Sequence, residues 1–340
     1  MGFWSASGAG AVVNHTEYPN NANASRKECM AAGNNCTWSH DLYTDVALEI
    51  LAEQAAAGPD APPLFLVLSY TDPHAGGWGG VAETGAPVPS DGVYANETWP
   101  IVERDHASVI STYQDRDVGR VVAALESSGL RSNTLVLFAS DNGAHNEGGH
   151  SVTFFNSSGP HRGFKRSLYE GGFRIPAGVS MPGTIPAGVV SDSVWAFWDV
   201  LPTVAAFAGV PPASLPPGLD GVSVEDAWRG VVTPRTAPLY WEFCTVHSPG
   251  SDGPTPSELA AMRAGAGAPA TWGHAVRDGD WKIVSFAVGD ALELYNVTAD
   301  PSERNNVAAA HPDVVSRLEA IAVAAHVDNP YFPVVNCVGS

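Results

Sequence analysis

The hydrophobic pattern alternates between helix-like and strand-like segments over the first part of the chain. Apolar residues at helical spacing predict an amphipathic helix over residues 41–57, which ends before Gly58-Pro59. The next apolar run, Leu64–Tyr70, has the length and composition of a parallel strand buried on both faces. A second helix is predicted over residues 106–127, and a second apolar strand over residues 135–139 follows it directly. This alternation predicts an α/β fold with a doubly wound, mostly parallel sheet flanked by helices.

The pattern changes beyond about residue 236. Before that point we predict a buried strand over residues 175–179, a helix over 195–208 and a proline-rich boundary segment over 210–217. After it we predict four short strands and one helix, over residues 239–243, 274–277, 281–285, 292–295 and 312–325. We therefore expect two domains: a large α/β domain over residues 1–235, and a small C-terminal subdomain over 236–340 with an antiparallel sheet and one packed helix.

Charge and hydropathy narrow the class of partners. The 340 residues carry a formal net charge of −19, spread along the chain, and no basic stripe offsets it. A polyphosphate would be repelled, so a nucleic-acid partner is excluded. The run Leu64–Tyr70 is too short to span a bilayer, and the stretch 194–210 is interrupted by Asp199 and Pro202. We expect no membrane span.

Glycosylation sequons favour a route through the secretory pathway. Six are present, at Asn14, Asn23, Asn35, Asn96, Asn156 and Asn296. Cys29 and Cys36 are close enough for a local disulfide, which only an oxidising compartment preserves. The N-terminus, Met1–Ala6, has neither the basic nor the apolar region of a signal peptide. Either the sequons of a cytosolic protein are unused, or the chain has lost its beginning. We favour the second, and expect a lysosomal or extracellular glycoprotein.

Candidate chemistry gathers after the predicted strand 135–139. Asp141 and Asn142 place a carboxylate and an amide at the end of this strand, where open α/β sheets bind ligands. Such oxygen donors suit a hard cation such as Ca²⁺, although an ordinary Asp-Asn-Gly turn is the commoner use of this tripeptide. Lys165 follows in the glycine-rich segment Gly163–Gly172. A lysine beside a divalent cation suits an anionic ester, a sulfate or a phosphate, while the alternative is a solvated surface lysine.

Histidines are the second set of candidates. His74 lies just beyond the predicted strand 64–70, where it can donate a hydrogen bond or a proton to an anionic ester, or cap a loop. His145, His150 and His161 crowd the region between the two motifs, with a spacing that matches no standard zinc signature. We treat these three as substrate-pocket candidates, with an exposed loop position as the commoner alternative.

Five blocks, taken in order along the chain, resemble the sulfatase family within the alkaline-phosphatase-like superfamily. They are Pro63–His74, Ser140–Gly143, Gly163–Pro176, Phe197–Thr203 and Leu294–Glu303. One Asp-Asn-Gly is a weak signal, but five ordered blocks from roughly residue 40 to residue 320 are a strong one. The resemblance implies an arylsulfatase-like sulfuric ester hydrolase that acts on a sulfated small molecule or a sulfated saccharide. Residues 1–235 would then belong to its catalytic domain.

The resemblance also implies roles for individual residues. Asp141 and Asn142 would bind calcium, and His74 and Lys165 would contact the sulfate. The family's nucleophile is a formylglycine, made from the first residue of a Cys/Ser-x-Pro/Ala-x-Arg segment. We expect this segment to be absent from the chain, because none of the four cysteines begins one and no cysteine or serine has the surroundings of an activated nucleophile. We expect that segment, an Asp-Asp calcium pair and a Lys-x-His segment to belong before residue 1, so that the chain resembles the C-terminal two thirds of a sulfatase.

Three hypotheses for function remain open at this point. The first is a sulfatase whose sequence has lost an N-terminal segment. The second is a catalytically inactive relative that acts as a binding protein. The third is a related metal-dependent phosphate-ester hydrolase, which the nucleophile region would distinguish from the first. One upstream loss accounts together for the signal peptide, the nucleophile and the calcium pair, so the first is our prediction.

Overall fold

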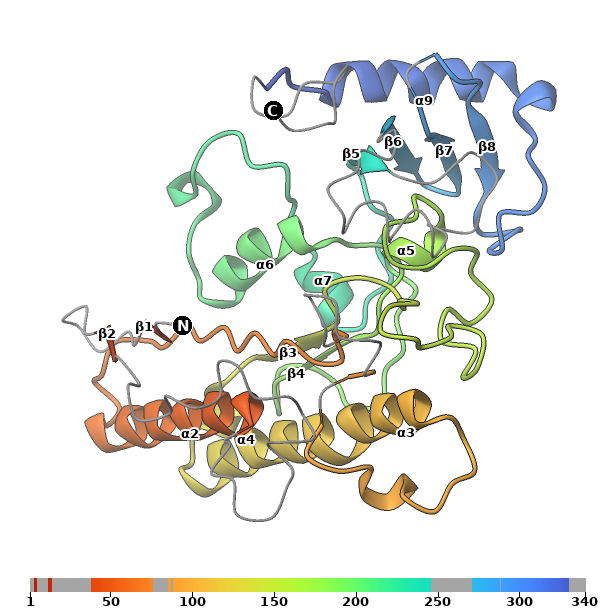
Figure 1. The fold of residues 1–340 in the computed structure, drawn as a ribbon. Coiled ribbons are helices and arrows are strands. Elements are labelled where there is room, and N and C mark those ends of the chain that lie inside the picture. The colour runs from red at the N-terminus through yellow and green to blue at the C-terminus, as the bar shows by residue number, and fades with distance from the viewer. Residues whose placement is uncertain are drawn as a thin grey trace. The chain divides into compact units, whose positions relative to one another are not determined.

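The computed structural model describes residues 38–75, 85–86, 88–245, 271–287 and 289–329, and the two-residue strands β1 (Phe3–Trp4) and β2 (Val12–Val13) (Figure 1). The chain divides into two compact units. Unit 1 comprises Met1–Thr134 and Glu147–Ser151, and unit 2 comprises Leu135–Asn146 and Val152–Ser340. The domain boundary expected after residue 235 stays a prediction.

Unit 1 is built on helices. Helix α2 (Ser39–Ala57) packs against α4 (Asp115–Ser127), which continues α3 (Ile101–Ser108) through a π-helical turn at Val109–Gln114. The helices predicted over residues 41–57 and 106–127 are confirmed, and the second begins earlier, at Ile101. None of the helices in the described part of the chain combines the length and apolar character needed to cross a bilayer.

The apolar run Leu64–Tyr70 is a difference between prediction and structure. It forms no strand in the described residues, and Phe65 and Val67 are 71% and 68% exposed. An apolar run indicates that a segment favours burial, but a strand also needs a neighbour that completes its backbone hydrogen bonds. None of the described segments pairs with this one.

Unit 2 begins with a two-stranded ladder. Strand β3 (Val136–Ala139) pairs antiparallel with β4 (Ala177–Ser180), with Leu137 opposite Val179. Both predicted strands are present, but β4 is largely exposed rather than buried. Every strand pair in the described part of the chain is antiparallel.

Short helices and turns complete the two units. The α-helical ones are α5 (Glu170–Phe173), α6 (Val200–Phe207) and α7 (Glu225–Trp228). The 3₁₀ turns are at Gly92–Tyr94, Arg131–Asn133, Phe197–Asp199, Pro212–Ser214 and Ala308–Ala310. The helix predicted over residues 195–208 is therefore a 3₁₀ turn followed by α6.

The C-terminal part of unit 2 is the small antiparallel sheet that the sequence predicts. Its strands are adjacent in chain order: β5 (Leu239–Thr245), β6 (Thr271–Asp278), β7 (Trp281–Ser285) and β8 (Glu293–Asn296). Helix α9 (Pro312–Ala325) packs on β6 and β7 (Figure 1). The predicted sheet with one packed helix is confirmed.

The two faces of this sheet bury different partners, because successive side chains of a strand point to opposite sides. Ile283 of β7 lies in one apolar cluster with Leu318 of α9. Val284, the next residue, lies in another cluster with Leu168 and Tyr169. The second face is therefore covered by the segment that follows Lys165, which ties that segment to the sheet.

Candidate functional site

Two backbone hydrogen bonds join the Asp141–Gly143 turn to the segment that carries Lys165. The Gly143 amide donates to the Gly172 carbonyl at 3.1 Å, and the Lys165 amide donates to the Ala144 carbonyl at 2.6 Å. All of these residues belong to unit 2. The structure therefore brings together, at the level of the backbone, the turn predicted to bind a cation and the loop predicted to bind an anion.

Glycines make this approach possible. A Cβ atom on Gly143 would lie 1.9 Å from the carbonyl oxygen of Gly171, and one on Gly171 would lie 2.1 Å from that of Gly163. A Cβ atom on Gly172 would lie 2.2 Å from the carbonyl oxygen of Ser167. Each distance is far inside van der Waals contact, so the glycines are needed where backbone packs on backbone.

The donor atoms of the turn suit a hard cation, but there are few of them. Asp141 is exposed and Asn142 is half-buried. The Asn142 side-chain nitrogen donates to the Gly143 carbonyl at 2.9 Å, so its oxygen, the atom that calcium binds, is outside that bond. In the described residues, His, Cys, Asp and Glu form no group of three or more that could hold a metal ion. Carboxylate and amide oxygens fit calcium in kind, and supply two of the about six to eight ligands it takes.

His74 and His150 both lie beside carboxylates in unit 1. His74 has a side chain that is 42% exposed, with Nε2 3.8 Å from Glu147 Oε2. His150 is buried, with Nδ1 2.5 Å from Glu103 Oε2, and its ring stacks on His106 at a centroid distance of 3.8 Å. His150 is thus a fixed, buried histidine, and His74 is an exposed one placed beside an acid.

The other two predicted histidines belong to unit 2. His145 is buried and directly follows Ala144, whose carbonyl accepts the Lys165 amide bond. His161 is half-buried, and its Nδ1 lies 3.1 Å from the Pro301 carbonyl oxygen. His145 is therefore next to the joined motifs, whereas the ring of His161 contacts a C-terminal segment.

A buried acid–histidine pair escaped the sequence analysis. His40 Nε2 lies 3.2 Å from Asp72 Oδ2, and accepts from the Thr71 and Asp72 amides at 3.1 Å. Burial lowers the pKa of His40 to about 4, and burial raises the pKa of Asp72 to about 7. Both side chains are therefore neutral between these values, consistent with a ring nitrogen that accepts hydrogen bonds. The two residues are distant in sequence, so no local sequence pattern predicts that they pair.

One serine segment was also missed. Ser158-Gly-Pro-His-Arg162 fits the serine form of the Cys/Ser-x-Pro/Ala-x-Arg pattern, which a comparison of the cysteines alone overlooks. The structure gives both of its ends structural contacts. Ser158 Oγ donates to the Gly163 carbonyl at 2.9 Å, and the Arg162 guanidinium lies 3.8 Å from the centre of the Tyr169 ring. These contacts shape the segment Gly163–Gly172, which we call the Lys165 loop, so we do not assign Ser158 as the nucleophile.

Comparison with known proteins identifies the family. A sequence profile described as "Sulfatase" matches residues 2–210. The chain belongs to the sulfatase family. Steryl-sulfatase of Rattus norvegicus is 36% identical over 137 residues, which is 39% of this chain and 23% of that protein. Choline-sulfatase of Rhizobium meliloti is 30% identical over 197 residues, 58% of this chain and 31% of that protein. The matches span about a quarter to a third of these relatives.

Solved structures share the fold. The crystal structure of Ps i-CgsB in complex with k-i-k-neocarrahexaose matches with a TM-score of 0.64 at 22% identity, over 85% of this chain and 56% of that one. The PsFucS1 sulfatase from Pseudoalteromonas sp. matches with a TM-score of 0.57 at 21% identity, over 84% of this chain and 52% of that one. This likeness confirms the predicted α/β, alkaline-phosphatase-like fold class.

Proposed function

We propose that this chain serves in a sulfuric ester hydrolase of the arylsulfatase-like type. The observation that carries the proposal is the pair of backbone hydrogen bonds that join the Asp141–Gly143 turn to the Lys165 loop, in a chain of the sulfatase family. Oxygen donors for a cation beside a lysine suit an anionic ester whose leaving oxygen gains negative charge. The substrate class is a sulfated small molecule or a sulfated saccharide.

Each candidate residue has a role in this proposal. Lys165 binds a sulfate oxygen and stabilises the departing alkoxide by its positive charge. Asp141 and Asn142 supply two oxygen ligands to calcium, which when bound would polarise the sulfate group. On the family resemblance, His74 donates the proton that the alkoxide takes up as the sulfur–oxygen bond breaks. The attacking oxygen would come from a formylglycine, to which we assign no residue of this chain.

One observation favours a second candidate, an inactive sulfatase-like binding protein. None of the four cysteines begins the nucleophile pattern, and Ser158, the serine that fits it, is engaged in the Lys165 loop. A chain with the lysine and the cation ligands but no nucleophile would bind sulfate esters without turning them over. Removing a nucleophile leaves only the residual rate that binding and electrostatics provide.

We further propose that the protein is a glycoprotein of the secretory pathway, lysosomal or extracellular. Asn96 and Asn156 begin sequons and are exposed, so a glycan can be attached without disturbing the fold. Asn296 is half-buried, and its Oδ1 accepts from the Ala299 amide at 2.9 Å, which makes it a poorer acceptor. Cys29 and Cys36 lie outside the described residues.

Turnover separates these functions. The protein, purified as it is expressed from its own gene, is incubated with 4-nitrophenyl sulfate and, in parallel, with 4-nitrophenyl phosphate, each with CaCl₂ and with EDTA. Calcium-dependent release of 4-nitrophenol from the sulfate ester supports the hydrolase. Saturable binding of the sulfate ester with no release supports the binding protein. Hydrolysis of the phosphate ester alone contradicts both the sulfatase and the binding protein, and favours a phosphate-ester hydrolase. If the sulfate ester is neither bound nor hydrolysed, the proposal is refuted.

A further inference from the structure

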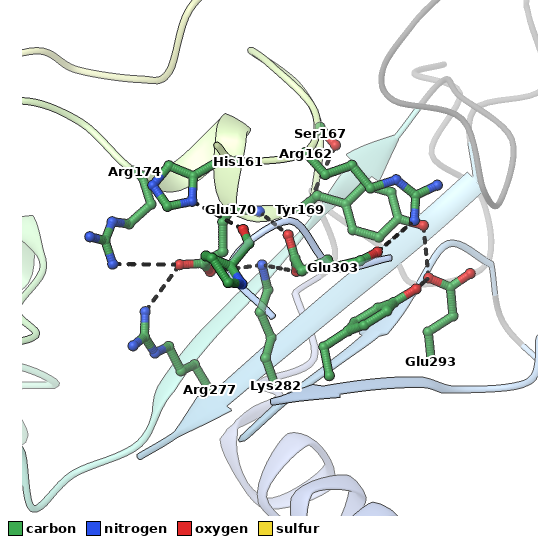
Figure 2. Close-up of polar contacts among 12 residues, drawn as sticks. His161, Arg162, Ser167, Tyr169, Glu170, Arg174, Arg277, Lys282, Glu293 and Glu303 are labelled. Carbon is green, nitrogen blue, oxygen red and sulfur yellow. Dashed lines mark hydrogen bonds and ion pairs between the residues drawn. The ribbon is translucent and has the colours of Figure 1, made fainter. Parts of the chain in front are cut away.

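A buried cluster of charges lies between the sheet and the Lys165 loop, and the proposed chemistry uses none of it. Lys282 of β7 is fully buried, and its Nζ lies 2.9 Å from Glu170 Oε1 and 2.9 Å from Glu303 Oε1. Arg277 donates from a terminal guanidinium nitrogen to Glu170 Oε2 at 3.0 Å. Figure 2 shows the Lys282 ammonium between the two carboxylates, with Arg277 on the far oxygen of Glu170. Arg174 lies farther out, with a terminal guanidinium nitrogen 4.0 Å from Glu170 Oε2. Three cations therefore face two carboxylates, and Lys282, Glu170 and Glu303 are nearly closed to water.

Such a cluster is sensitive to the loss of one member. Burial by itself raises the pKa of Glu170, but the positive charges of Lys282 and Arg277 outweigh it, so this pKa lies below its ordinary value. Burial raises the pKa of Glu303, and the Lys282 charge opposes that rise. Without the ammonium group, Glu303 would lose the cation that it pairs with, and Glu170 would keep only Arg277 and the more exposed Arg174. Breaking a buried ion pair in this way is strongly destabilising.

The cluster is connected to the predicted site through very few bonds. Glu170 is the first residue of α5, and its amide donates to Glu303 Oε2 at 2.5 Å. The next residue, Gly171, donates to the Arg162 carbonyl at 2.7 Å, and Gly172 accepts from the amide of the Asp141–Gly143 turn at 3.1 Å. The position of Glu170 therefore determines where the loop meets the turn.

The alternation of β7 directs Lys282 to this side of the sheet. Lys282 has the same strand parity as Val284, which packs with Leu168 and Tyr169. Its Nζ also lies 4.9 Å from the centre of the Phe173 ring in α5. Ile283 points to the opposite face and packs in the cluster beneath α9. Strand β7 thus carries two adjacent residues with different surroundings: Lys282 contacts α5, and Ile283 is buried on the opposite face of the sheet.

We propose that Lys282 is a positioning residue for Lys165: its ammonium group pairs with Glu170 and Glu303, holds α5 in place, and so fixes the Lys165 loop against the Asp141–Gly143 turn. The inference rests on the proposed function, because anion binding by Lys165 is itself a proposal. A lysine that only stabilised the fold would lower stability when replaced, and would leave the contact between loop and turn unchanged in the folded state.

The test compares Lys282→Met, which keeps most of the side-chain volume and removes the charge, with Ile283→Val on the other face of the same strand. The first readout is hydrogen exchange at the Gly143 and Lys165 amides, whose bonds join turn and loop. The second is the affinity for inorganic sulfate by isothermal titration calorimetry. We expect Lys282→Met to speed exchange at both amides by about tenfold beyond the change at core amides of β7, and to weaken sulfate binding by about tenfold. Ile283→Val should leave the sulfate affinity unchanged, and should change exchange at the Gly143 and Lys165 amides no more than exchange at the core amides of β7.

A charge-neutral variant keeps the test decisive where Lys282→Met does not fold. Lys282→Met/Glu303→Gln removes one positive and one negative charge and leaves Glu170 paired with Arg277 at 3.0 Å, and replacing a buried ion pair in full is often neutral for stability. We expect it to fold and to show the same fast exchange at the Gly143 and Lys165 amides. Protection of both amides at the wild-type level in either variant overturns the proposal. If the wild-type chain binds no sulfate while the variants still lose protection, the positioning role stands and the proposed function fails.

Discussion

Replacing Gly143 by alanine tests the joined motifs directly. The new Cβ atom would lie 1.9 Å from the Gly171 carbonyl oxygen and 2.9 Å from its carbon, so both nearest atoms are backbone. Ordinary contact begins at 3.4 Å, so the turn and α5 must separate by 3.4 − 1.9 = 1.5 Å. The charge cluster around Glu170 resists movement of α5. We therefore expect the turn to move, and the Asp141 and Asn142 side chains with it.

The cost follows from the contacts that this shift breaks. The Gly143–Gly172 hydrogen bond of 3.1 Å cannot survive it, which costs about 1 kcal/mol. Overpacking adds about 1–3 kcal/mol. The φ of Gly143 lies outside the left-handed region, so alanine brings no backbone strain and returns about 0.4–1 kcal/mol by restricting the unfolded chain. The net loss should be about 1–3 kcal/mol of unfolding free energy.

Urea unfolding followed by circular dichroism measures this loss, and a sulfate titration of the folded variant measures its effect on the site. Gly178→Ala is the matched control, because Gly178 lies in β4 with no atom within 4 Å of a new Cβ. The control should keep or slightly raise stability and leave sulfate binding unchanged. If Gly143→Ala is as stable as Gly178→Ala and binds sulfate with equal affinity, the close approach of turn and loop seen in the structure is contradicted.

The remaining predictions concern pH and glycosylation. The buried pair titrates in opposite senses: His40 has a lowered pKa, so its contribution to stability is present above pH 6.5 and lost as the pH falls towards about 4. Asp72 has a raised pKa, so its contribution is present below pH 3.8 and lost as the pH rises towards about 7. The two pH dependences cancel in the wild type. In Asp72→Asn only that of His40 remains, so the free energy of unfolding should rise by about 3 kcal/mol between about pH 4 and 6.5 relative to the wild type. A difference in urea midpoint between variant and wild type that stays constant across this window would contradict the prediction. For protein secreted from eukaryotic cells, Asn96→Gln and Asn156→Gln should each remove one glycan by mass spectrometry; a mass unchanged in both would refute the exposed acceptor sites.

The elements that the sequence predicts well are those whose pattern arises within the element itself. The helical spacing of residues 41–57 and 312–325 matches α2 and α9 because each helix buries one face against a neighbour. The short strands of the C-terminal sheet follow from β-branched and aromatic residues between turns. The run 64–70 was predicted as a strand but forms none in the described residues, because a hydrophobic run does not determine which strand would pair with it.

The site divides in the same way. Asp141, Asn142 and Lys165 were predicted from motifs that lie in compact segments; the structure joins those segments by backbone hydrogen bonds, and the roles of the three residues stay predictions. Lys282 and Glu170 pair across a sequence separation of 112 residues, and a single charged residue in a short strand normally indicates an exposed face. Contacts of that range depend on how the segments pack, which local pattern does not contain.

The most direct test of the central claim is a calorimetric titration of inorganic sulfate into the chain in the presence of CaCl₂. The wild type should bind sulfate, and Lys165→Ala should bind it about tenfold or more weakly, because a hydrogen bond to a charged group is lost. Arg317→Ala, which removes one positive charge from the exposed side of α9, should bind as the wild type does. Equal weakening in both variants, or sulfate binding that Lys165→Ala leaves unchanged, would contradict the assignment of Lys165 to the sulfate.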